Sequence, residues 1–337
     1  MSKVTVPLKR VVFMGTPDFA VPVLEALVEA GYQLAGVFTQ PDRPKGRSGK
    51  PAFSPVKEAA LAHGIPVFQP EKIRKAENAQ LLRQLEPDVI VVAAFGQIIP
   101  KEILELPPYG CVNVHASLLP KYRGAAPIQW AVINGERESG VTTMQMGEGL
   151  DTGDILMKKV RILEPDETGG SLFDKLKEDG AALLIDTLKG LEAGIITPEK
   201  QPDESPTPYA AMLTKKDGQI DWNAGAAAIE RLVRGLDPWP SAYTFLDGKQ
   251  LKIWKAVPAE GSETAEGADT SESPAEKALP GTVICADRGT MRVLTGDGVL
   301  EIRELQMEGK KRMETAAFLR GYPIRAGEVI LGDTITR

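Results

Sequence analysis

The sequence has few of the residue types that build covalent cross-links or metal centres. Only two cysteines and two histidines occur in 337 residues. Cys111 and Cys285 have no metal-like spacing and lie in different predicted domains, so we expect two reduced thiols rather than a disulfide. The same scarcity of ligands disfavours a zinc site. We therefore expect a protein without a bound metal ion.

Long apolar runs are missing as well. No uninterrupted apolar stretch reaches the roughly 20 residues needed to cross a bilayer. Residues 1–9 contain neither a signal-peptide core nor an arginine-rich amphipathic pattern, so we expect a cytoplasmic protein with no membrane partner. A content of 42% hydrophobic and 26% charged residues excludes a chain that is disordered throughout, and the length suffices for two domains.

Net positive charge, the usual mark of a protein that binds phosphate, is also absent, since the formal net charge is −6. One segment accounts for this value. Residues 258–276 contain six acidic side chains and no lysine or arginine, so the remainder of the chain is neutral on average. Because this segment has almost no apolar side chain to bury, we expect residues 258–280 to form a disordered acidic loop.

Basic side chains concentrate in two places along the chain. The first is a loop after a predicted strand, with Arg43, Lys45, Arg47 and Lys50. The second contains Lys310, Lys311 and Arg312. Taken alone, each cluster is more simply interpreted as a solvated loop than as a binding site.

In the first half of the chain, apolar runs alternate with helical patterns, which is typical of a parallel sheet with crossover helices. We predict an α/β domain over residues 1–196 with a Rossmann-like, mostly parallel sheet. The predicted strands are 10–14, 33–39, 66–68, 88–95, 111–115 and 141–146. The predicted helices are 19–30, 55–63, 78–85, 127–134 and 171–191. The first turn, Gly15-Thr16-Pro17-Asp18, lacks the glycines of a G-x-G-x-x-G loop, which argues against an NAD-dependent enzyme.

The second half has another pattern and no internal repeat. Residues 197–208 contain four prolines and are interpreted as an extended linker. A second domain is then predicted over 209–337, with short alternating strands and a hairpin turn at Gly296-Asp297-Gly298. Five such strands predict a small barrel of the OB type, a scaffold often used on nucleic acids. The predicted strands are 242–246, 251–256, 281–286, 290–295 and 299–305.

The most informative polar residues lie at the end of a predicted buried strand. Asn113 and His115 are two positions apart, so their side chains lie on one face of the strand. In an open α/β sheet, ligands bind at the carboxyl ends of the strands. An amide donor and an imidazole at such an end suit oxyanion stabilisation and proton transfer. For a lone histidine a structural role would be the better interpretation, as it is for His63 near a predicted helix end.

A carboxylate usually orients an imidazole that transfers protons. The glycine-rich segment 147–154 supplies two candidates, Asp151 and Asp154. Asp151 comes first after the predicted strand, whereas Asp154 begins the next segment and could equally cap a turn. We therefore expect Asp151 to be the partner of His115.

Four segments carry a resemblance to a known family: Phe13–Ala20, Gln40–Arg47, Asn113–Pro127 and Asp237–Pro240. Together they resemble the folate-dependent formyltransferases, and the match runs through nearly the whole chain. The N-terminal segments are shared with family members that formylate glycinamide ribonucleotide or sugar nucleotides. The C-terminal part and the loop around Arg47 resemble the branch that acts on methionyl-tRNA.

The resemblance implies an enzyme that transfers the formyl group of 10-formyltetrahydrofolate to the amino group of methionine on initiator tRNA. It assigns catalysis, without a metal, to Asn113, His115 and Asp151. Tetrahydrofolate would rest on a wall formed by Ser117, Leu118, Leu119 and Pro120. The two leucines could also be core residues and the proline part of a turn. Phe95 and Gln97, at another predicted strand end, would line the pterin pocket.

The same resemblance implies contacts with tRNA. Arg47 would read the acceptor end, while phosphates would be attracted by Arg43, Lys45, Lys50, Lys310 and Lys311. We expect a monomer, although no motif sets the oligomeric state.

Two alternative functions stay open at this point. One is formylation of a small amino-sugar nucleotide or of glycinamide ribonucleotide, for which the long basic loop and the second domain would be superfluous. The other is a non-catalytic RNA-binding module. The joint presence of the three residues assigned to catalysis argues against that alternative.

Overall fold

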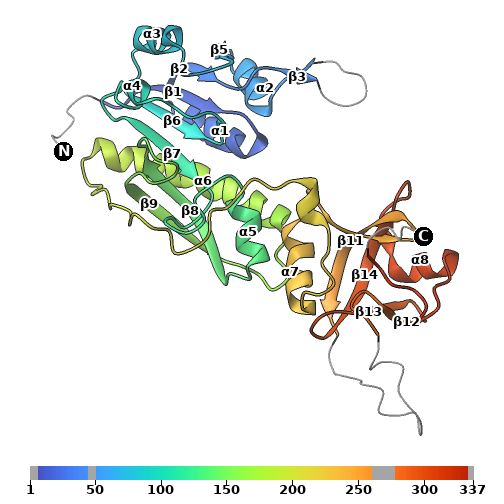
Figure 1. The fold of residues 1–337 in the computed structure, drawn as a ribbon. Coiled ribbons are helices and arrows are strands. Elements are labelled where there is room, and N and C mark those ends of the chain that lie inside the picture. Colours follow the sequence, from blue (N-terminus) through green and yellow to red (C-terminus); the bar gives the residue numbers. More distant parts are fainter. Residues whose placement is uncertain (1–6, 45–50, 260–277, 333–337) are drawn as a thin grey trace. The chain divides into compact units, whose positions relative to one another are not determined.

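The computed structural model describes residues 7–44, 51–259 and 278–332 (Figure 1). Two compact units divide the chain, and neither is continuous in sequence. The first contains the residues up to Pro127 together with Arg137–Leu163 and Leu172–Ala211. The second contains Ile128–Glu136, Glu164–Ser171 and the residues from Met212 onward. The chain therefore passes between the units five times, whereas the sequence suggests a single division at 197–208.

The first unit is built on a seven-stranded sheet in the order β5-β2-β1-β6-β7-β8-β9. Strands β5, β2, β1, β6 and β7 run parallel, so the expectation of a mostly parallel sheet is confirmed. The strands are β1 (Arg10–Gly15), β2 (Gln33–Phe38), β5 (Val67–Phe68), β6 (Val89–Ala93), β7 (Cys111–His115), β8 (Glu138–Gln145) and β9 (Ile155–Ile162). A separate two-stranded pair joins β3 (Arg43–Pro44) to β4 (Pro51–Ala52).

Two features of this sheet differ from the sequence expectation. Strand β8, predicted within a parallel sheet, runs antiparallel to β7, with Val112 paired to Gln145. Strand β9 was not predicted, and it pairs antiparallel with β8 at the edge of the sheet. Most of its second half is exposed at this edge, and Lys158, Lys159 and Arg161 interrupt the apolar run that a central strand would show.

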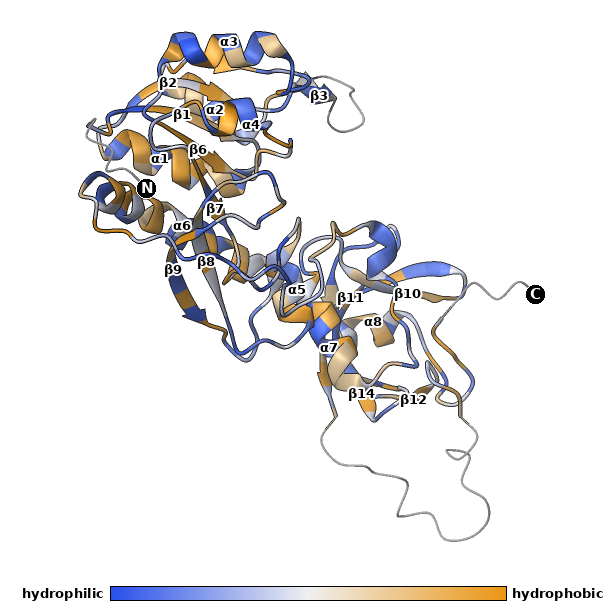
Figure 2. Ribbon diagram, turned by 60° about the vertical axis from the view of Figure 1, so that its left-hand side comes forward, coloured by the Kyte–Doolittle hydropathy of each residue, from blue (hydrophilic) through white to orange (hydrophobic). Residues whose placement is uncertain are grey.

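Helices cover both faces of this sheet. On one face, α3 and α4 share a core with alternate residues of β1 and β6, such as Val12 and Val92. On the other face, α6 lies close to Val114 of β7, where a Cβ at Gly180 would be 2.9 Å from its side chain. Figure 2 shows hydrophobic residues along the central strands and a mixture of both kinds along α3. The helices are α1 (Val21–Glu29), α2 (Pro55–Ala62), α3 (Ala76–Leu85), α4 (Lys101–Leu104) and α6 (Gly169–Glu192).

The second unit contains a six-stranded antiparallel sheet. Its main path is β10-β11-β14-β13-β12, and β15 pairs with β14. The hairpin predicted at residues 296–298 joins β13 to β14, where Thr295 N donates to Gly298 O. The elements are α5 (Pro127–Ile133, mostly in this unit), α7 (Ala226–Gly235), β10 (Ala242–Leu246), β11 (Lys249–Pro258), β12 (Val283–Asp287), β13 (Thr290–Leu294), β14 (Val299–Met307), β15 (Met313–Glu314) and α8 (Thr315–Gly321).

The two outer strands of this sheet are connected by the chain segment 329–332. Ile330 forms a bridge with Thr282 before β12, and Gly332 N donates to Phe245 O of β10. A ring of backbone pairing of this kind is how small barrels avoid unpaired edges. The sequence pattern predicts the barrel strands but gives no sign of this closing segment.

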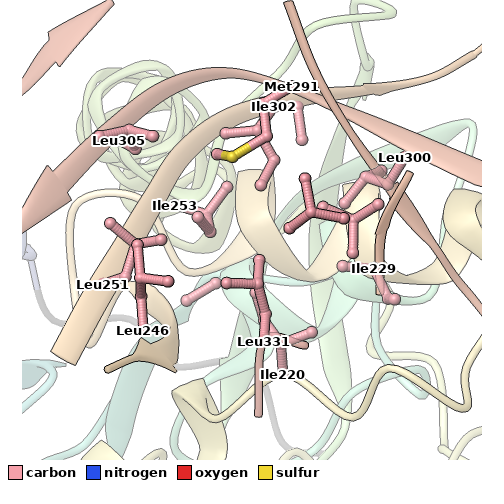
Figure 3. Packing of buried hydrophobic residues seen from close by; sticks show 14 of the residues in the cluster. Ile220, Ile229, Leu246, Leu251, Ile253, Met291, Leu300, Ile302, Leu305 and Leu331 are labelled. Carbon is pink, nitrogen blue, oxygen red and sulfur yellow. The ribbon is translucent and has the colours of Figure 1, made fainter. Parts of the chain in front are cut away.

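The core of the second unit lies inside this sheet and is covered by α7. Figure 3 shows side chains converging there from several strands, among them Ile253, Met291 and Ile302. Helix α7 also binds the two earlier segments of this unit, Ile128–Glu136 and Glu164–Ser171. Arg231 Nε donates to Ile133 O at 3.2 Å, and Arg234 Nη1 donates to Glu167 O at 2.7 Å. Helix α7 therefore holds segments that precede it by almost 100 and 67 residues.

Part of the predicted acidic loop 258–280 lies outside the described residues, namely 260–277. Its first residue, Pro258, belongs to β11 rather than to a loop. Among the helices that the structure describes, none is long and apolar enough to span a membrane.

Candidate active site

The geometry of β7 places three side chains on one face of the sheet. Cys111, Asn113 and His115 alternate with Val112 and Val114. Cys111 lies under α4, where its Sγ is 3.8 Å from Ile103 O, and burial raises the pKa of its thiol to about 12. Further along the strand, Asn113 and His115 are only 8% and 7% exposed. The polar pair therefore lies largely buried at the carboxyl end of the strand.

His115 has a defined hydrogen-bonding state. Its Nε2 is 3.0 Å from the backbone oxygen of Tyr122. A carbonyl only accepts hydrogen bonds, so Nε2 carries the proton and donates it. The second ring nitrogen, Nδ1, is then the one that can accept a proton, and it lies 3.8 Å from Asp151 Oδ1. A proton taken up at Nδ1 is stabilised by that carboxylate.

Asp151 reaches His115 by an indirect route. Because β8 is antiparallel to β7, the loop after β8 begins opposite Val112 and must return toward the carboxyl end of β7. There the second carboxylate oxygen of Asp151 accepts a hydrogen bond from Gly124 N at 2.9 Å. Asp154 is bound differently, since its backbone oxygen accepts from Gln145 N at the start of β9. The structure thus brings Asp151, and not Asp154, to His115.

The side-chain amide of Asn113 receives no hydrogen bond from the residues that the structure describes. An amide on the same strand face as His115 and without a protein partner is available to a bound ligand. The three groups together supply a neutral donor, a proton acceptor and a negative charge that supports the protonated acceptor. This combination can stabilise an oxyanion while moving a proton.

The segment predicted as the folate wall is fixed to β8. Thr142 Oγ1 donates to Ser117 O at 2.6 Å and accepts from Leu119 N at 3.1 Å. Leu119 is fully buried, while Leu118 and Pro120 remain half-buried. The predicted alternative, that these residues also serve as core and turn, therefore fits Leu119, which packs with Met144.

The two residues predicted for the pterin pocket are engaged within the protein. Phe95 is a core residue of the α3 and α4 face. The amide of Gln97 donates to Pro70 O and accepts from Ile73 N, at 3.0 and 2.7 Å. Gln97 therefore orders the loop before α3.

The basic loop after β2 has an anchored base. Asp42 accepts from Lys57 Nζ at 2.5 Å and from Gln69 Nε2 at 2.8 Å. The hydrogen bond from Lys57 is the main cause that lowers the pKa of the Asp42 carboxyl. Arg43 is exposed in β3. The other predicted cations of this loop, Lys45, Arg47 and Lys50, lie outside the described residues.

The second predicted cationic site is a turn in the other unit. Lys310 and Lys311 are both exposed between β14 and β15. Their neighbour Arg312 stacks on the ring of Trp254, with its guanidinium carbon 4.9 Å from the ring centre.

His63, interpreted from sequence as a helix-end residue, lies after α2, where Nε2 is 2.6 Å from Glu25 Oε2.

Two buried residues at the site were not identified from the sequence. Arg123 and Gln201 are 7% and 4% exposed, and they bind one another. Arg123 lies inside the Asn113–Pro127 block, which could have drawn attention to it. Gln201 lies in the proline-rich segment 197–208, where nothing in the sequence distinguishes it from a linker residue.

The sequence and the fold of the chain match those of known proteins. Residues 9–188 match the model of the formyl transferase family, and residues 212–323 match that of the formyl transferase C-terminal domain. A methionyl-tRNA formyltransferase of Lachnospira eligens is 56% identical over 96% of this chain and 100% of its own. A second one, from Agathobacter rectalis, is 54% identical over 94% of this chain and 98% of its own.

Solved structures of lower identity share the fold. The N-formyltransferase from Helicobacter canadensis, in complex with folinic acid and dTDP-3-aminofucose, has a TM-score of 0.62 at 18% identity and covers 91% of this chain and 100% of its own. HypX from Aquifex aeolicus, in complex with tetrahydrofolic acid, has a TM-score of 0.58 at 18% identity and covers 93% of this chain and 47% of its own.

Proposed function

The chain belongs to the formyltransferase family, and from this premise we propose that it transfers the formyl group of 10-formyltetrahydrofolate to the amino group of methionine on initiator methionyl-tRNA. One observation carries the chemistry. The amide of Asn113, which has no hydrogen-bond partner among the described residues, lies on the same strand face as His115, whose accepting nitrogen faces the carboxylate of Asp151. Such a reaction belongs to translation initiation, which places the protein in the cytoplasm.

The first step of the reaction needs a donor for a developing negative charge. The amine attacks the formyl carbon, so the carbonyl oxygen becomes an oxyanion as the new C–N bond forms. Asn113 is the residue suited to stabilise it, because its Nδ2 hydrogens are free for that oxygen. The backbone that carries this donor is fixed, since β7 is paired on both sides.

The second requirement is a path for the amine proton. His115 Nδ1 takes the proton that the attacking nitrogen loses, and Asp151 stabilises the imidazolium that results. The intermediate then collapses, the bond between the formyl carbon and the N10 nitrogen of the folate breaks, and His115 returns the proton to that leaving nitrogen. The proton that His115 takes during the attack is thus returned when the intermediate collapses.

The binding of both substrates is proposed on the same basis. The folate rests along Ser117, Leu118, Leu119 and Pro120, and Phe95 and Gln97 support the neighbouring wall from within the fold. The tRNA is held by Arg43, Lys45, Arg47, Lys50, Lys310 and Lys311. The similarity of both matched domains to methionyl-tRNA formyltransferases, over nearly their full length, supports this acceptor over an amino sugar.

The test is a comparison of acceptors with radiolabelled 10-formyltetrahydrofolate. We expect label transfer to initiator methionyl-tRNA, and none to uncharged initiator tRNA or to a dTDP-linked amino sugar. Because uncharged tRNA lacks the amino group, it controls for binding without reaction. Preferred transfer to the amino sugar would contradict the proposal and favour a small-molecule formyltransferase.

A further inference from the structure

Residues 201–210 form a strap that holds both loops of the active site. This segment was interpreted from sequence as part of an extended linker, yet it binds the loop after β7 throughout its length. The donors and acceptors are Ala125 N and Ala126 N to Ala210 O, Ala210 N to Arg123 O, Tyr122 N to Thr207 Oγ1, and Ser205 Oγ to Pro120 O. The strap therefore fixes residues that include the partner of His115.

The first residue of the strap binds the other loop. Gln201 Nε2 donates to Asp151 O at 2.9 Å and to Gly153 O at 2.7 Å. Both hydrogens of this amide are consequently used on the loop that carries the carboxylate. The loop is also tightly packed, because a Cβ at Gly153 would lie 1.8 Å from Gln145 O.

Arg123 fixes the direction in which the amide of Gln201 points. Its Nε and Nη2 donate to Gln201 Oε1 at 3.2 and 3.0 Å. Two further guanidinium hydrogens bind the strap, through Pro202 O at 2.7 Å and Asp203 O at 3.1 Å. With its oxygen held by a buried cation, the amide can only present its nitrogen to Asp151, and the positive charge strengthens that donor.

Asp151 requires such support because of its backbone conformation. Its φ angle is 52°, in the left-handed region that residues with a Cβ rarely adopt. Its side chain makes one direct hydrogen bond, from Gly124 N, and lies 3.8 Å from His115 Nδ1. Rotation of the peptide would therefore move the carboxylate away from the imidazole, and the bond from Gln201 to Asp151 O opposes that rotation.

We propose that Gln201, oriented by Arg123, is a positioning residue for the reaction: it sets the distance between the Asp151 carboxylate and His115. The inference rests on the proposed role of Asp151 in formyl transfer. It differs from a purely structural role, because loss of the Gln201 donor should change the chemical step and leave both folding and substrate binding intact.

The decisive variant is Gln201→Glu. A glutamate keeps the size of the side chain and pairs with Arg123, but it has no hydrogen to give to Asp151 O or Gly153 O. We expect kcat with methionyl-tRNA to fall on the order of 10- to 100-fold, as for a small misplacement of a catalytic group. We expect KM for 10-formyltetrahydrofolate and the melting temperature to change little. Gln80→Glu, an exposed change of the same charge on α3, is the control and should keep full activity.

A double substitution separates positioning from structure. In an Asp151→Asn background, Gln201→Glu should cost almost nothing more, because the group that it positions is already disabled. Arg123→Lys, which cannot form the fork, should act in the same direction as Gln201→Glu. Normal kcat in Gln201→Glu, or effects that multiply in the double variant, would overturn the inference. Failure of the unmodified protein to formylate methionyl-tRNA would instead overturn the proposed function.

Discussion

At the scale of single residues, Asp151 combines an unfavourable backbone with a well-held side chain. A non-glycine residue in the left-handed region costs about 1 to 3 kcal/mol and persists only where its surroundings fix it. Here Gly124 N holds the carboxylate and Gln201 holds the carbonyl. These bonds direct one oxygen of the carboxylate toward His115, so this strain serves the site rather than the stability of the fold.

The first expectation concerns the donor and the base. His115→Ala and Asn113→Ala should each lower kcat by roughly 100-fold or more, because general acid–base and oxyanion contributions have this size. Folate binding should be largely kept. The measurement is steady-state formylation of methionyl-tRNA, with His63→Ala as the control outside the site. Near-normal turnover in His115→Ala would mean that another group moves the proton.

The two nearby carboxylates give a second expectation. Asp151→Asn should impair kcat far more than Asp154→Asn, because only Asp151 faces His115 Nδ1 and can stabilise its positive charge. The two variants remove the same charge three residues apart, so each controls for the other. Single-turnover rates with methionyl-tRNA would decide the matter, and the reverse order of effects would contradict the geometry.

At the scale of elements, the sequence predicted the positions of the strands and the parallel run of five of them, but not the direction of β8. Strand β7 is a short apolar run at a place where both faces are covered, and its bounds were predicted correctly. The direction of β8 could not be predicted, since a strand has the same hydrophobic pattern whether it pairs parallel or antiparallel. Asp151 was predicted as the partner of His115 because it comes first after this strand, and the loop after β8 brings it there by folding back.

Gln201, which lies buried beside the site, is not marked by any pattern in the sequence. Gln201 is a polar residue between prolines, and its side-chain nitrogen donates to backbone carbonyls 48 and 50 residues away. Hydrogen bonds to backbone oxygens place no demand on the residue type of the partner, so no pattern in the chain reports them. Helix α7 was also missed, because it lies before the alternating strands that dominate the second half.

The ion pairs between α6 and the edge strand β9 predict that the free energy of unfolding depends on pH. Asp179 accepts from Arg161 Nε at 2.6 Å and from Lys159 Nζ at 2.8 Å. The hydrogen bond from Arg161, above all, lowers the pKa of this carboxyl below its usual value. The charged form is favoured by folding, so its stabilisation is present above the ordinary carboxyl pKa of about 4 and is lost as the pH falls through the lowered value.

Asp179→Asn should therefore lower the free energy of unfolding at pH 7 by about 1.5 to 3 kcal/mol, the size of charged hydrogen bonds. The difference from the unmodified protein should shrink below about pH 4 as the native carboxylate also becomes protonated. Denaturant unfolding at several pH values measures this, with the exposed Asp186→Asn on the same helix as the control. A deficit independent of pH would point to lost packing instead.

The sequence of the loop 42–50 predicts that its arginines affect the reaction with tRNA in different ways. Arg47→Ala should cost about 1 to 3 kcal/mol in kcat/KM with initiator methionyl-tRNA, the size of one specific contact. Arg43→Ala should mainly flatten the salt dependence, as expected for general phosphate attraction. The assay compares initiator tRNA with a tRNA that has a strong first acceptor pair. If Arg47→Ala keeps both rate and discrimination, specificity arises elsewhere.

At the scale of the whole molecule, the two units are interleaved along the chain. Segments 128–136 and 164–171 belong to the second unit although they precede the strap. Arg231 and Arg234 of α7 bind their backbone oxygens, and Gly235 allows close approach, since a Cβ there would be 2.4 Å from Ile133 Cγ1. A fragment that begins at residue 209 would therefore lack part of its own unit.

The acidic segment should be dispensable for this architecture. Deleting residues 260–276 and joining the flanks with a short turn should leave the melting temperature and kcat nearly unchanged, because the segment has almost no apolar side chain to bury. If it lies near the path of the tRNA, the deletion should tighten binding at low salt by removing six negative charges. Loss of the folded state on deletion would show that the segment packs.

The interleaving has a consequence for how the protein is made. During translation, Ile133 leaves the ribosome 98 residues before Arg231, the side chain on α7 that binds its backbone oxygen. At about 5 to 20 residues per second, α5 waits for roughly 5 to 20 s before its partner helix has been synthesised. Its residues Ala131 and Val132, which are buried in the folded protein, are apolar and are synthesised before that helix. Nascent chains stalled after α5 has left the ribosome and before α7 is complete should thus be the ones that chaperones engage through this helix.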